Sequence, residues 1–358
     1  MRAALMVEND APLVVEELQG ATGLDDHDVE VRVEATGVCH SDLTLLGGLM
    51  PPPTVLGHEG AGSVVAVGRD VTRVRVGDRV VASFTPACGD CWYCVRDMSQ
   101  HCKRAFRFAT TTRWHRRDGT PVLSASGLGT FADTLRTHEA SLVAVRSDLP
   151  AEQLALIGCA VTTGVGAALT TAPVAPGDVV AVIGCGGVGQ FVVQGARIAG
   201  AAAVVAVDPS PDKRAFAAAV GATHAIDPTD GGLLDELRAL TGGRGVDVAF
   251  EVVGRPELVR AAFDATRRGG TTVIVGMPPL DAEVALPMFA WFNDEKRVVG
   301  CNYGSAQVRR EFPRLVALAE AGRLDIGAAV TTVRPLDEVN AAIDDLRVGA
   351  VIRTVLRP

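Results

Sequence analysis

Residues 179–189 read Val-Val-Ala-Val-Ile-Gly-Cys-Gly-Gly-Val-Gly, and this stretch decides the fold of the second half of the chain. The first five residues are a continuous apolar run, typical of a strand buried on both faces of a parallel sheet. The next six match G-x-G-x-x-G, and residues 188–199 have helical spacing. Strand, tight turn and helix together predict a unit that holds the pyrophosphate of a dinucleotide at the helix N-terminus. The predicted contacts of the turn are Gly184, Gly186, Gly187 and Gly189.

A carboxylate follows where such a unit binds ribose. Asp208 lies 19 residues after Gly189 (208 − 189) and directly follows the next apolar run, 203–207. It can accept hydrogen bonds from the adenosine ribose, and its charge repels the 2′-phosphate of NADP, so NAD is the predicted cofactor. The alternative interpretation is an ordinary tight turn beside a surface acid.

Strands and helices alternate through this half, which predicts an α/β fold with a doubly wound parallel sheet. Before residue 150, short strand-like runs punctuated by Gly and Pro predict a mainly β domain instead. We expect the tail to rejoin that domain, giving a first domain of residues 1–160 completed by 304–358, and an NAD-binding domain of residues 161–303. The predicted strands are 29–34, 63–67, 79–84, 179–183, 203–207, 246–250, 271–275, 297–301, 328–332 and 351–355. The predicted helices are 151–156, 188–199, 212–220, 256–265, 308–321 and 336–346.

Composition excludes several classes of protein. Of the 358 residues 48% are hydrophobic and 21% charged, which is typical of a globular protein and excludes a disordered one. The net charge of −8 argues against nucleic acid as a partner. We find no apolar run of the roughly 18 residues that cross a bilayer. The N-terminus reaches Glu8 too early for a signal peptide, so we predict a cytoplasmic protein without a membrane partner.

Four of the eight cysteines are clustered: Cys88, Cys91 and Cys94, with Cys102 after seven further residues. Four thiolates can saturate a tetrahedral zinc and leave no open position. Such a site would fix a loop and would not do chemistry. The alternatives are two disulfides or chance clustering, which reducing conditions and the spacing of the cysteines disfavour.

A second candidate metal site is spread along the chain. Cys39 and His58 stand in two polar islands, Cys39-His40-Ser41-Asp42 and Gly57-His58-Glu59-Gly60, and Cys159 follows in a helical stretch. The three would give a Cys₂His set with a fourth position free for a substrate. The alternative is a hydrogen-bonded core histidine and a small buried cysteine.

Taken in order along the whole chain, these motifs resemble the zinc-dependent medium-chain alcohol dehydrogenases. The lead-in Phe84-Thr85-Pro86-Ala87-Cys88 is similar to the branch that holds the liver-type and glutathione-dependent formaldehyde dehydrogenases, and Val275-Gly276-Met277-Pro278-Pro279 also fits the family order. The resemblance implies a GroES-like catalytic domain, a Rossmann cofactor domain, two zinc ions per subunit and NAD(H). It further implies a homodimer or tetramer, with residues 289–305 in the region where cofactor domains pair; the alternative for these residues is ordinary core packing.

The resemblance also assigns roles to residues. It implies that Cys39, His58 and Cys159 bind the catalytic zinc, that Glu59 lies behind the metal as an alternate ligand, and that Asp42 supports His58. It implies that Ser41 touches the alcohol oxygen and starts the proton relay. The other implied contacts are Met50 and Phe84 in the substrate pocket, Thr163, Val188 and Val275 near the nicotinamide, His40 and Arg353 at the pyrophosphate, and Lys213 near the ribose. The alternatives are a solvated charge for Lys213, core packing for Phe84 and a strand cap for Arg353.

One position departs from the family pattern. Many relatives have a histidine three residues after the relay serine, where this chain has Thr44. The proton's exit would then be slower, run through water or use another group, with His115 as a remote candidate. His115 lies in the basic segment 113–117, which we interpret as a solvated loop; the alternative is an anion-binding lid for a charged substrate.

The predicted function is hydride transfer between a primary or secondary alcohol and NAD, which yields an aldehyde or ketone. A thiol-dependent formaldehyde dehydrogenase, using glutathione or mycothiol, is the first alternative. An aldehyde or imine reductase of secondary metabolism is the second. A catalytically silent cofactor-binding protein is a third, against which the complete set of metal ligands argues.

Overall fold

The computed structural model describes residues 1–21 and 23–358, which form two compact units. Unit 1 contains Met1–Cys159, Gln307–Gly322 and Ile326–Pro358, and unit 2 contains Ala160–Ala306 with Arg323–Asp325. The two boundaries lie after residues 159 and 306, close to the predicted 160 and 303 but not at them.

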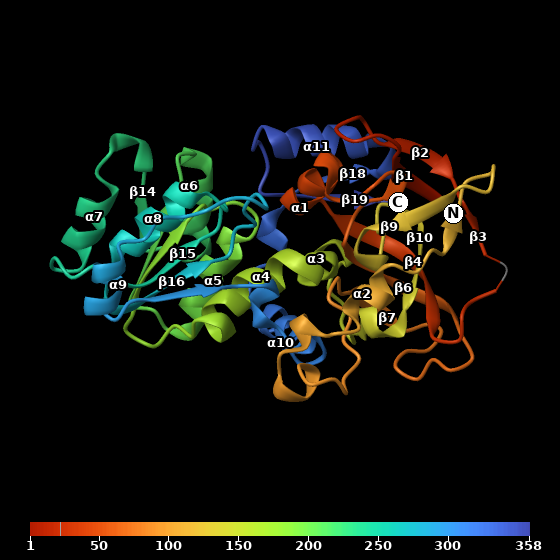
Figure 1. Ribbon diagram of the computed structural model, residues 1–358, viewed down its shortest axis with the longest axis horizontal. Coiled ribbons are helices and arrows are strands. Elements are labelled where there is room, and N and C mark those ends of the chain that lie inside the picture. The colour runs from red at the N-terminus through yellow and green to blue at the C-terminus, as the bar shows by residue number, and fades with distance from the viewer. Residues whose placement is uncertain (22) are drawn as a thin grey trace. The chain divides into compact units, whose positions relative to one another are not determined.

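Unit 2 is built on six parallel strands in the order β14-β13-β12-β15-β16-β17 (Figure 1). This order starts in the middle and runs outward in both directions, which confirms the predicted doubly wound α/β class. The strands are β12 (Val179–Ile183), β13 (Ala203–Val207), β14 (His224–Ile226), β15 (Val246–Glu251), β16 (Thr266–Ile274) and β17 (Arg297–Gly300).

Helices cover both faces of this sheet, which explains the continuous apolar run of β12. Val180 and Val182 pack in a cluster with residues of α5 and α6, whereas Ala181 and Ile183 pack with α7 and α8. Alternate side chains of a strand point to opposite faces, so a strand covered on both sides needs apolar residues throughout. The helices are α4 (Thr162–Gly166), α5 (Gly189–Ala199), α6 (Pro211–Val220), α7 (Leu233–Leu240), α8 (Pro256–Ala265) and α9 (Met288–Asn293). Short 3₁₀ turns are η8 (Pro228–Asp230) and η9 (Tyr303–Ser305).

Unit 1 contains two largely antiparallel sheets. One has the order β2-β1-β5-β9-β8-β3, and the other has β11-β7-β6-β4-β19-β18, with β10 also paired to β4. The strands are β1 (Arg2–Met6), β2 (Val14–Glu17), β3 (Gln19–Gly20), β4 (Asp28–Gly37), β5 (Thr54–Val55), β6 (Glu59–Val67), β7 (Arg79–Ala82), β8 (Trp114–His115), β9 (Pro121–Ser124), β10 (Thr134–His138), β11 (Leu142–Ala144), β18 (Val330–Pro335) and β19 (Arg353–Arg357). The last strand of the chain, β19, therefore lies beside β4 near its beginning.

Helices in unit 1 are short apart from two near the C-terminus. They are α1 (His40–Thr44), α2 (Ala105–Ala109), α3 (Ala151–Leu156), α10 (Val308–Glu320) and α11 (Val339–Arg347). The 3₁₀ turns are η2 (Cys94–Arg96), η3 (Ser99–His101), η4 (Ala125–Gly127), η5 (Glu139–Ser141), η10 (Gly327–Ala329) and η11 (Leu336–Glu338), and η1 (Leu45–Leu49) is π-helical.

Several predicted strands shift at their ends. The strand predicted at 328–332 begins only at Val330, because Gly327–Ala329 forms a 3₁₀ turn. The strand predicted at 351–355 is Arg353–Arg357, where pairing with β4 and β18 fixes the register. The run 79–84 ends its pairing at Ala82. Where these strands begin and end depends on pairing with neighbouring strands, and the local sequence pattern does not contain that information.

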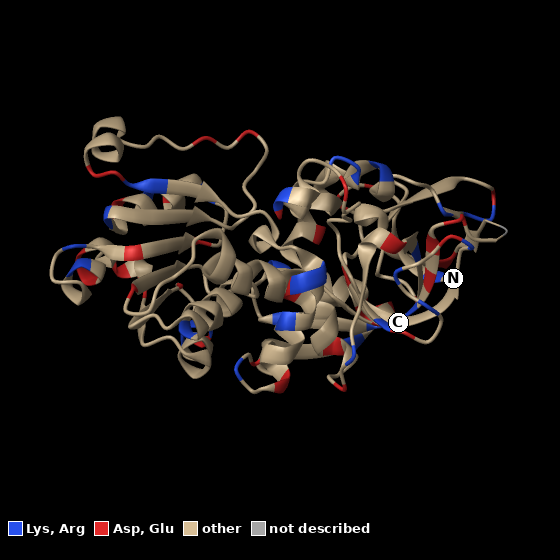
Figure 2. Cartoon of the chain, turned by 90° about the horizontal axis from the view of Figure 1, so that it is seen from below, with Lys and Arg blue, Asp and Glu red and all other residues tan. Residues whose placement is uncertain are grey.

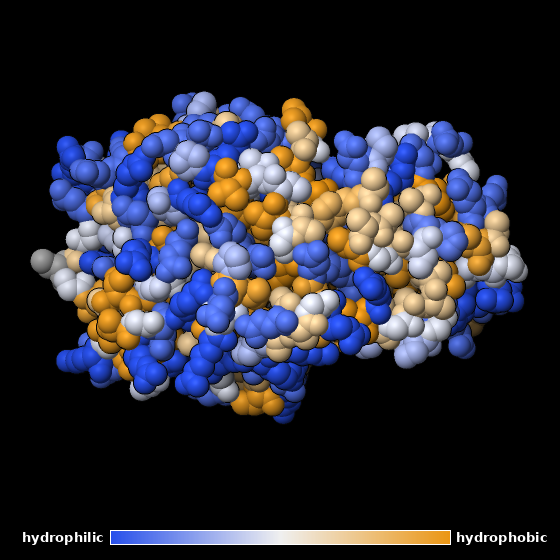
Figure 3. Space-filling view, turned by 180° about the vertical axis from the view of Figure 1, so that it is seen from behind, coloured by the Kyte–Doolittle hydropathy of each residue, from blue (hydrophilic) through white to orange (hydrophobic). Residues whose placement is uncertain are grey.

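The prediction that no apolar run reaches the length of a membrane span was wrong. Ala151–Thr171 is one continuous helix of 21 residues, made of α3, η6 (Ile157–Val161), α4 and η7 (Ala167–Thr171), and its most apolar window has a mean hydropathy of 1.7. Interspersed glycines and threonines obscured the run. Inside the protein 72% of that window is buried, which is the behaviour of a core helix. On the face drawn in Figure 3, hydrophilic residues are interspersed with hydrophobic ones.

Candidate metal and cofactor sites

Four buried side chains meet at one point of unit 1. Cys39, His58, Glu59 and Cys159 each offer a ligand atom, and these atoms all lie within 4.8 Å of one another. Cys39 follows β4 and precedes α1, His58 directly precedes β6, Glu59 begins that strand, and Cys159 lies in η6. The pairing of Gly37 with Glu59 brings the end of β4 to the start of β6, which joins two of these segments.

Asp42 orients two of the four. Its Oδ2 accepts the backbone N–H of Cys39 at 2.9 Å, and its Oδ1 lies 3.0 Å from His58 Nδ1. Burial opposes charge on His58, but the Asp42 carboxylate outweighs it and raises the His58 pKa. Because Nδ1 faces Asp42, Nε2 is the nitrogen left to face a metal.

Glu59 and Arg353 form a buried ion pair behind this cluster. Glu59 Oε1 accepts from Arg353 Nη2, while Glu59 Oε2 and Arg353 Nε have no hydrogen-bond partner among the described residues. Burial raises the pKa of Glu59 to about 7, against the lowering effect of Arg353. Gly37 is required here, because a Cβ at that position would lie 2.1 Å from Glu59 Oε2.

The residues at this point fit a zinc ion. Two thiols and an imidazole are the ligand types that zinc prefers, and a buried carboxylate oxygen without a partner lies in the same cluster. A hydrogen bond from Cys159 holds the pKa of Cys39 well below its usual range, so the cluster favours a thiolate. Cys39, His58 and Cys159 would hold the ion, with Glu59 within reach of it.

The second cluster joins Cys88, Cys91, Cys94 and Cys102, whose sulfur atoms also lie within 4.8 Å of one another. The Sγ of Cys88 is 3.8 Å from that of Cys94 and 3.5 Å from that of Cys102, far longer than a disulfide bond of ~2.05 Å. Backbone N–H groups of Cys94 and Lys103 donate to the Cys91 sulfur and lower its pKa to about 6. Four sulfurs in this arrangement fit a closed tetrahedral zinc site.

In unit 2 the glycine turn joins β12 to α5. Asp208 accepts the backbone N–H of Cys185 at 2.8 Å through Oδ2 and that of Ser210 at 2.9 Å through Oδ1. A Cβ at Gly189 would meet the Gly184 carbonyl oxygen at 2.0 Å, whereas one at Gly186 would meet nothing within 4 Å. Gly189 thus allows the close approach of helix and strand. Gly186 faces the open side of the turn, from which a pyrophosphate would approach.

The other predicted site residues lie on or beside several elements of the two units. Ser41 Oγ is 3.8 Å from Cys39 Sγ, and the ring of Phe84 stands edge-on to His58 with centroids 5.5 Å apart. Met50 packs at the edge of a core cluster of unit 1, and His40, the first residue of α1, is exposed. In unit 2, Thr163 is buried in α4, Val188 caps α5, Lys213 lies in α6 and Val275 follows β16. The predicted cofactor contacts of His40, Arg353 and the unit 2 residues stay predictions.

Comparison with known families and proteins covers nearly the whole chain. Residues 25–147 match the alcohol dehydrogenase GroES-like domain, and residues 187–321 match the zinc-binding dehydrogenase family. The S-(hydroxymethyl)glutathione dehydrogenase of Saccharomyces cerevisiae is 36% identical over 373 residues, which cover 99% of this chain and 95% of that protein. The chain belongs to the zinc-containing medium-chain alcohol dehydrogenase family. It is a zinc-dependent dehydrogenase, an oxidoreductase that acts on alcohols, as predicted.

Further members of the family agree with this assignment. The S-(hydroxymethyl)glutathione dehydrogenase of Paracoccus denitrificans is 35% identical, over 99% of both chains. A zinc-binding-domain alcohol dehydrogenase from Burkholderia ambifaria superposes with a TM-score of 0.94 at 33% identity, covering 99% of this chain and 98% of that one. The benzyl alcohol dehydrogenase of Acinetobacter calcoaceticus gives 0.92 at 30% identity with the same coverage.

The basic segment 113–117 is more ordered in this dehydrogenase than the expected solvated loop. Trp114 and His115 form β8, and Arg113 is a buried residue bonded through Nε and Nη2 to both oxygens of Asp28. Arg116 pairs with Glu16 and Arg117 with Glu17. All three arginines already have carboxylate partners, which disfavours the anion-binding lid.

An open surface hollow of unit 1, with a volume of about 480 Å³, contains none of the predicted site residues. It is lined by residues 72–75, 77–79 and 144–147. Acidic and basic residues are interspersed along the chain in Figure 2.

The sequence did not predict several residues that support the sites through hydrogen bonds to the surrounding backbone. Gln190 Nε2 donates to the carbonyls of Cys185 and Lys213, and so fixes the glycine turn to α6. Its only signal is a polar residue at a buried position of an amphipathic helix. Glu251, at the end of β15, accepts the backbone N–H groups of Val253 and Gly254. Arg73 and Arg309, which hold the four-cysteine loop, were also missed.

Proposed function

We propose that this enzyme transfers hydride between a primary or secondary alcohol and NAD. The observation that carries the proposal is the meeting of Cys39, His58 and Cys159 from three distant segments, with ligand atoms within 4.8 Å of one another. When bound, zinc lowers the pKa of an alcohol and polarises a carbonyl, and NAD accepts the hydride.

Residues of unit 1 position the reacting oxygen and remove its proton. Asp42 holds His58 with Nε2 toward the ion, as its contact with Nδ1 requires. The Ser41 hydroxyl, beside the Cys39 sulfur, accepts the alcohol proton through a hydrogen bond and passes it on. Thr44 stands where many relatives have a histidine, so the proton leaves by way of water rather than an imidazole.

Asp208 supports NAD over NADP. Its carboxylate is buried and anchored by two backbone N–H groups, so it cannot swing away from a 2′-phosphate. We place the enzyme in the cytoplasm, where its eight free cysteines stay reduced.

A homodimer is supported by exposed apolar side chains on one short helix of unit 2. Met288, Phe289 and Phe292 of α9 are 83%, 77% and 81% exposed, which is unusual for side chains of this size. The strand β17 forms the edge of the sheet directly after this helix. Pairing of two such edges would cover both features.

The test is formation of NADH by the zinc-loaded protein with a panel of aliphatic and aromatic alcohols, benzyl alcohol included. Cys39→Ser should lose roughly 10³-fold or more in kcat/KM, because the metal's contribution is worth several kcal/mol. The matched control is Cys301→Ser, a buried cysteine of unit 2 outside both clusters. Undiminished turnover by Cys39→Ser would contradict the proposal.

A thiol-dependent formaldehyde dehydrogenase is the second candidate, because two relatives at 35–36% identity have that activity in their names. The same assay with formaldehyde distinguishes the two. NADH formation that requires glutathione or mycothiol would favour the second candidate, and equal rates without thiol would favour the first.

A further inference from the structure

Two arginines from separate elements hold the beginning of the four-cysteine loop. Arg73, between β6 and β7, donates Nη1 to the carbonyl of Ala87 at 3.1 Å and Nη2 to that of Cys88 at 3.0 Å. Arg309, in the first turn of α10, donates Nη2 to the same Ala87 carbonyl at 2.9 Å. Arg73 lies 14 positions before Ala87, whereas Arg309 lies 222 positions after it.

The N–H ends of these same peptide groups face sulfur. The Ala87 carbonyl and the Cys88 N–H belong to one peptide group, and that N–H lies 3.4 Å from Cys102 Sγ. The Cys88 carbonyl and the Gly89 N–H form the next group, and the Gly89 N–H donates to the Cys94 sulfur. A peptide group has a dipole of ~3.5 D with its positive end at the N–H. Each guanidinium thus binds the negative end of a dipole whose positive end points at a sulfur.

The charges explain why two cations gather here. Four thiolates around one zinc ion leave two surplus negative charges, which a partly buried site does not tolerate without compensation. Arg73 and Arg309 repel each other: burial, and then the nearby Arg73, lower the pKa of Arg309, while the cysteines act in the opposite direction. The buried Glu139 carboxylate accepts the backbone N–H groups of Thr72 and Arg73, which fixes the Arg73 backbone.

We propose that Arg73 and Arg309 are positioning residues for the structural zinc. They polarise two successive peptide groups toward Cys102 and Cys94, stabilise the thiolates there and slow the release of the metal. This inference rests on a zinc ion at the four cysteines, which belongs to the proposed cofactor content.

The first experiment measures release of zinc from the intact enzyme to a colorimetric chelator. Arg309→Met and Arg73→Met should each speed release of one zinc equivalent about 10-fold, and the double variant should do so more strongly, since outer partners of metal ligands change affinity by 10–100-fold. The second zinc equivalent, at Cys39, His58 and Cys159, serves as an internal reference. Arg73→Lys, which keeps the charge but loses the two-pronged contact, should release zinc at a rate between those of Arg73→Met and the wild type.

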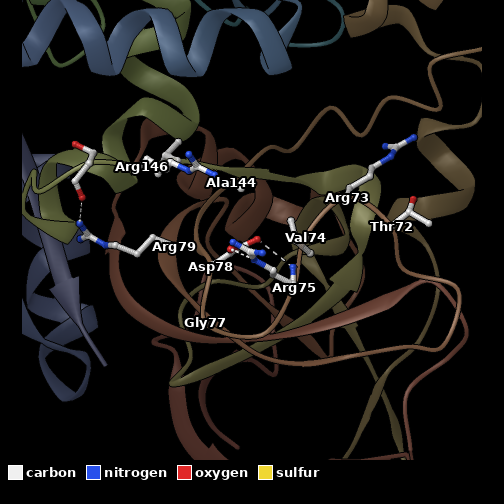
Figure 4. Close-up of a pocket in the computed structure, with 11 residues that line it drawn as sticks. Thr72, Arg73, Val74, Arg75, Gly77, Asp78, Arg79, Ala144 and Arg146 are labelled. Atoms are coloured by element: carbon white, nitrogen blue, oxygen red, sulfur yellow. Dashed lines mark hydrogen bonds and ion pairs between the residues drawn. The ribbon is translucent and has the colours of Figure 1, made fainter.

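Arg75→Met is the matched control. Arg75 lies in the same loop two residues after Arg73, but its guanidinium turns to Asp78, with Nε 3.3 Å from Oδ1 (Figure 4). Release from Arg75→Met should equal that from the wild type. Release within twofold of wild type in both Arg309→Met and Arg73→Met would overturn the inference, and so would equal acceleration in Arg75→Met. A wild-type protein without metal at these cysteines would overturn the proposed cofactor as well, so the two failures are distinguishable.

A spectroscopic measurement separates polarisation from a loss of packing. With Co²⁺ in the four-cysteine site, removal of the arginines should move the sulfur-to-cobalt charge-transfer band to longer wavelength, because the sulfur electrons are held less tightly. An unchanged band in Arg309→Met would overturn the proposed effect on the sulfurs. The single variants keep the test valid where the double variant does not fold.

Discussion

Single residues that touch no metal decide the geometry of the catalytic cluster. Asp42 has two oxygens and serves two donors, the Cys39 backbone and the His58 ring, so it fixes two ligands at once. Gly37 leaves the space that the Glu59 carboxylate fills. Removing the Asp42 carboxylate would leave a buried donor without its acceptor, and adding a side chain at position 37 would create a clash with Glu59.

We predict that Asp42→Asn weakens zinc binding at the catalytic site about 10–100-fold, with a parallel loss of turnover. Asparagine has one acceptor oxygen where two donors need one each, so either Cys39 or His58 loses its orientation. Zinc content after dialysis and kcat/KM measure the effect. Asp337→Asn, at an exposed carboxylate of unit 1, is the control. Unchanged zinc affinity in Asp42→Asn would contradict the assigned role.

His138 predicts a dependence of stability on pH. Burial lowers its pKa below the ordinary 6.5, and its Nδ1 accepts the backbone N–H of Ala140 at 3.0 Å. The unfolded chain therefore takes up the proton first, so this group's contribution is complete above pH 6.5 and is lost as pH falls from there toward the folded-state pKa. His138→Asn keeps an acceptor but does not titrate. Thermal unfolding between pH 5 and 7 should show a flatter profile for the variant than for the wild type, and identical profiles would refute the assignment.

At the scale of elements, the glycine turn between β12 and α5 separates two functions. Gly189 allows the helix to approach the strand, and Gly186 faces open space. We predict that Gly189→Ala destabilises the protein by roughly 1–3 kcal/mol, because its methyl group overlaps a backbone oxygen. Gly186→Ala should leave stability nearly unchanged but weaken NAD binding, because the methyl group occupies the pyrophosphate side.

Thermal unfolding and NAD titration measure the two effects, and each variant is the control for the other. A stable Gly189→Ala protein, or unaltered NAD affinity in Gly186→Ala, would contradict this division.

The elements predicted most accurately are those for which the local sequence marks both the beginning and the end. Val179–Ile183 and Pro256–Ala265 were predicted to the residue, because an apolar run and its turn or proline mark both ends. The helix at Ala151–Thr171 was predicted only for its first turns, 151–156, because the glycines and threonines that follow hid its full length. Among site residues, spacing gave the cysteines of the loop, and a resemblance was needed to join Cys39 to Cys159. Arg73 and Arg309 had no signal, since their partners are backbone carbonyls, which any residue carries, and the partner of Arg309 lies 222 positions away.

For the whole molecule, the exposed apolar side chains of α9 indicate an interface with a second copy of the chain. We predict that Phe289→Ser with Phe292→Ser shifts the protein from dimer to monomer in sedimentation equilibrium, because it removes much of the apolar area that would be buried. Phe106→Ser is the matched control, since Phe106 in unit 1 is also 78% exposed. A wild type that sediments as a monomer, or a double variant that stays dimeric, would contradict the predicted pairing.

The sheet that holds the metal ligands is completed by a strand, β19, that lies more than 300 positions after the sheet's first strand, β4. Both segments of unit 2, Ala160–Ala306 and Arg323–Asp325, precede β19 in the chain, so on the ribosome this unit can fold while the edge of β4 that β19 covers is still open. Arg353, the ionic partner of Glu59, is synthesised 294 residues after it. A nonsense mutation at position 353 would therefore spare the cofactor unit and leave the metal centre with a bare sheet edge and an unpaired buried acid.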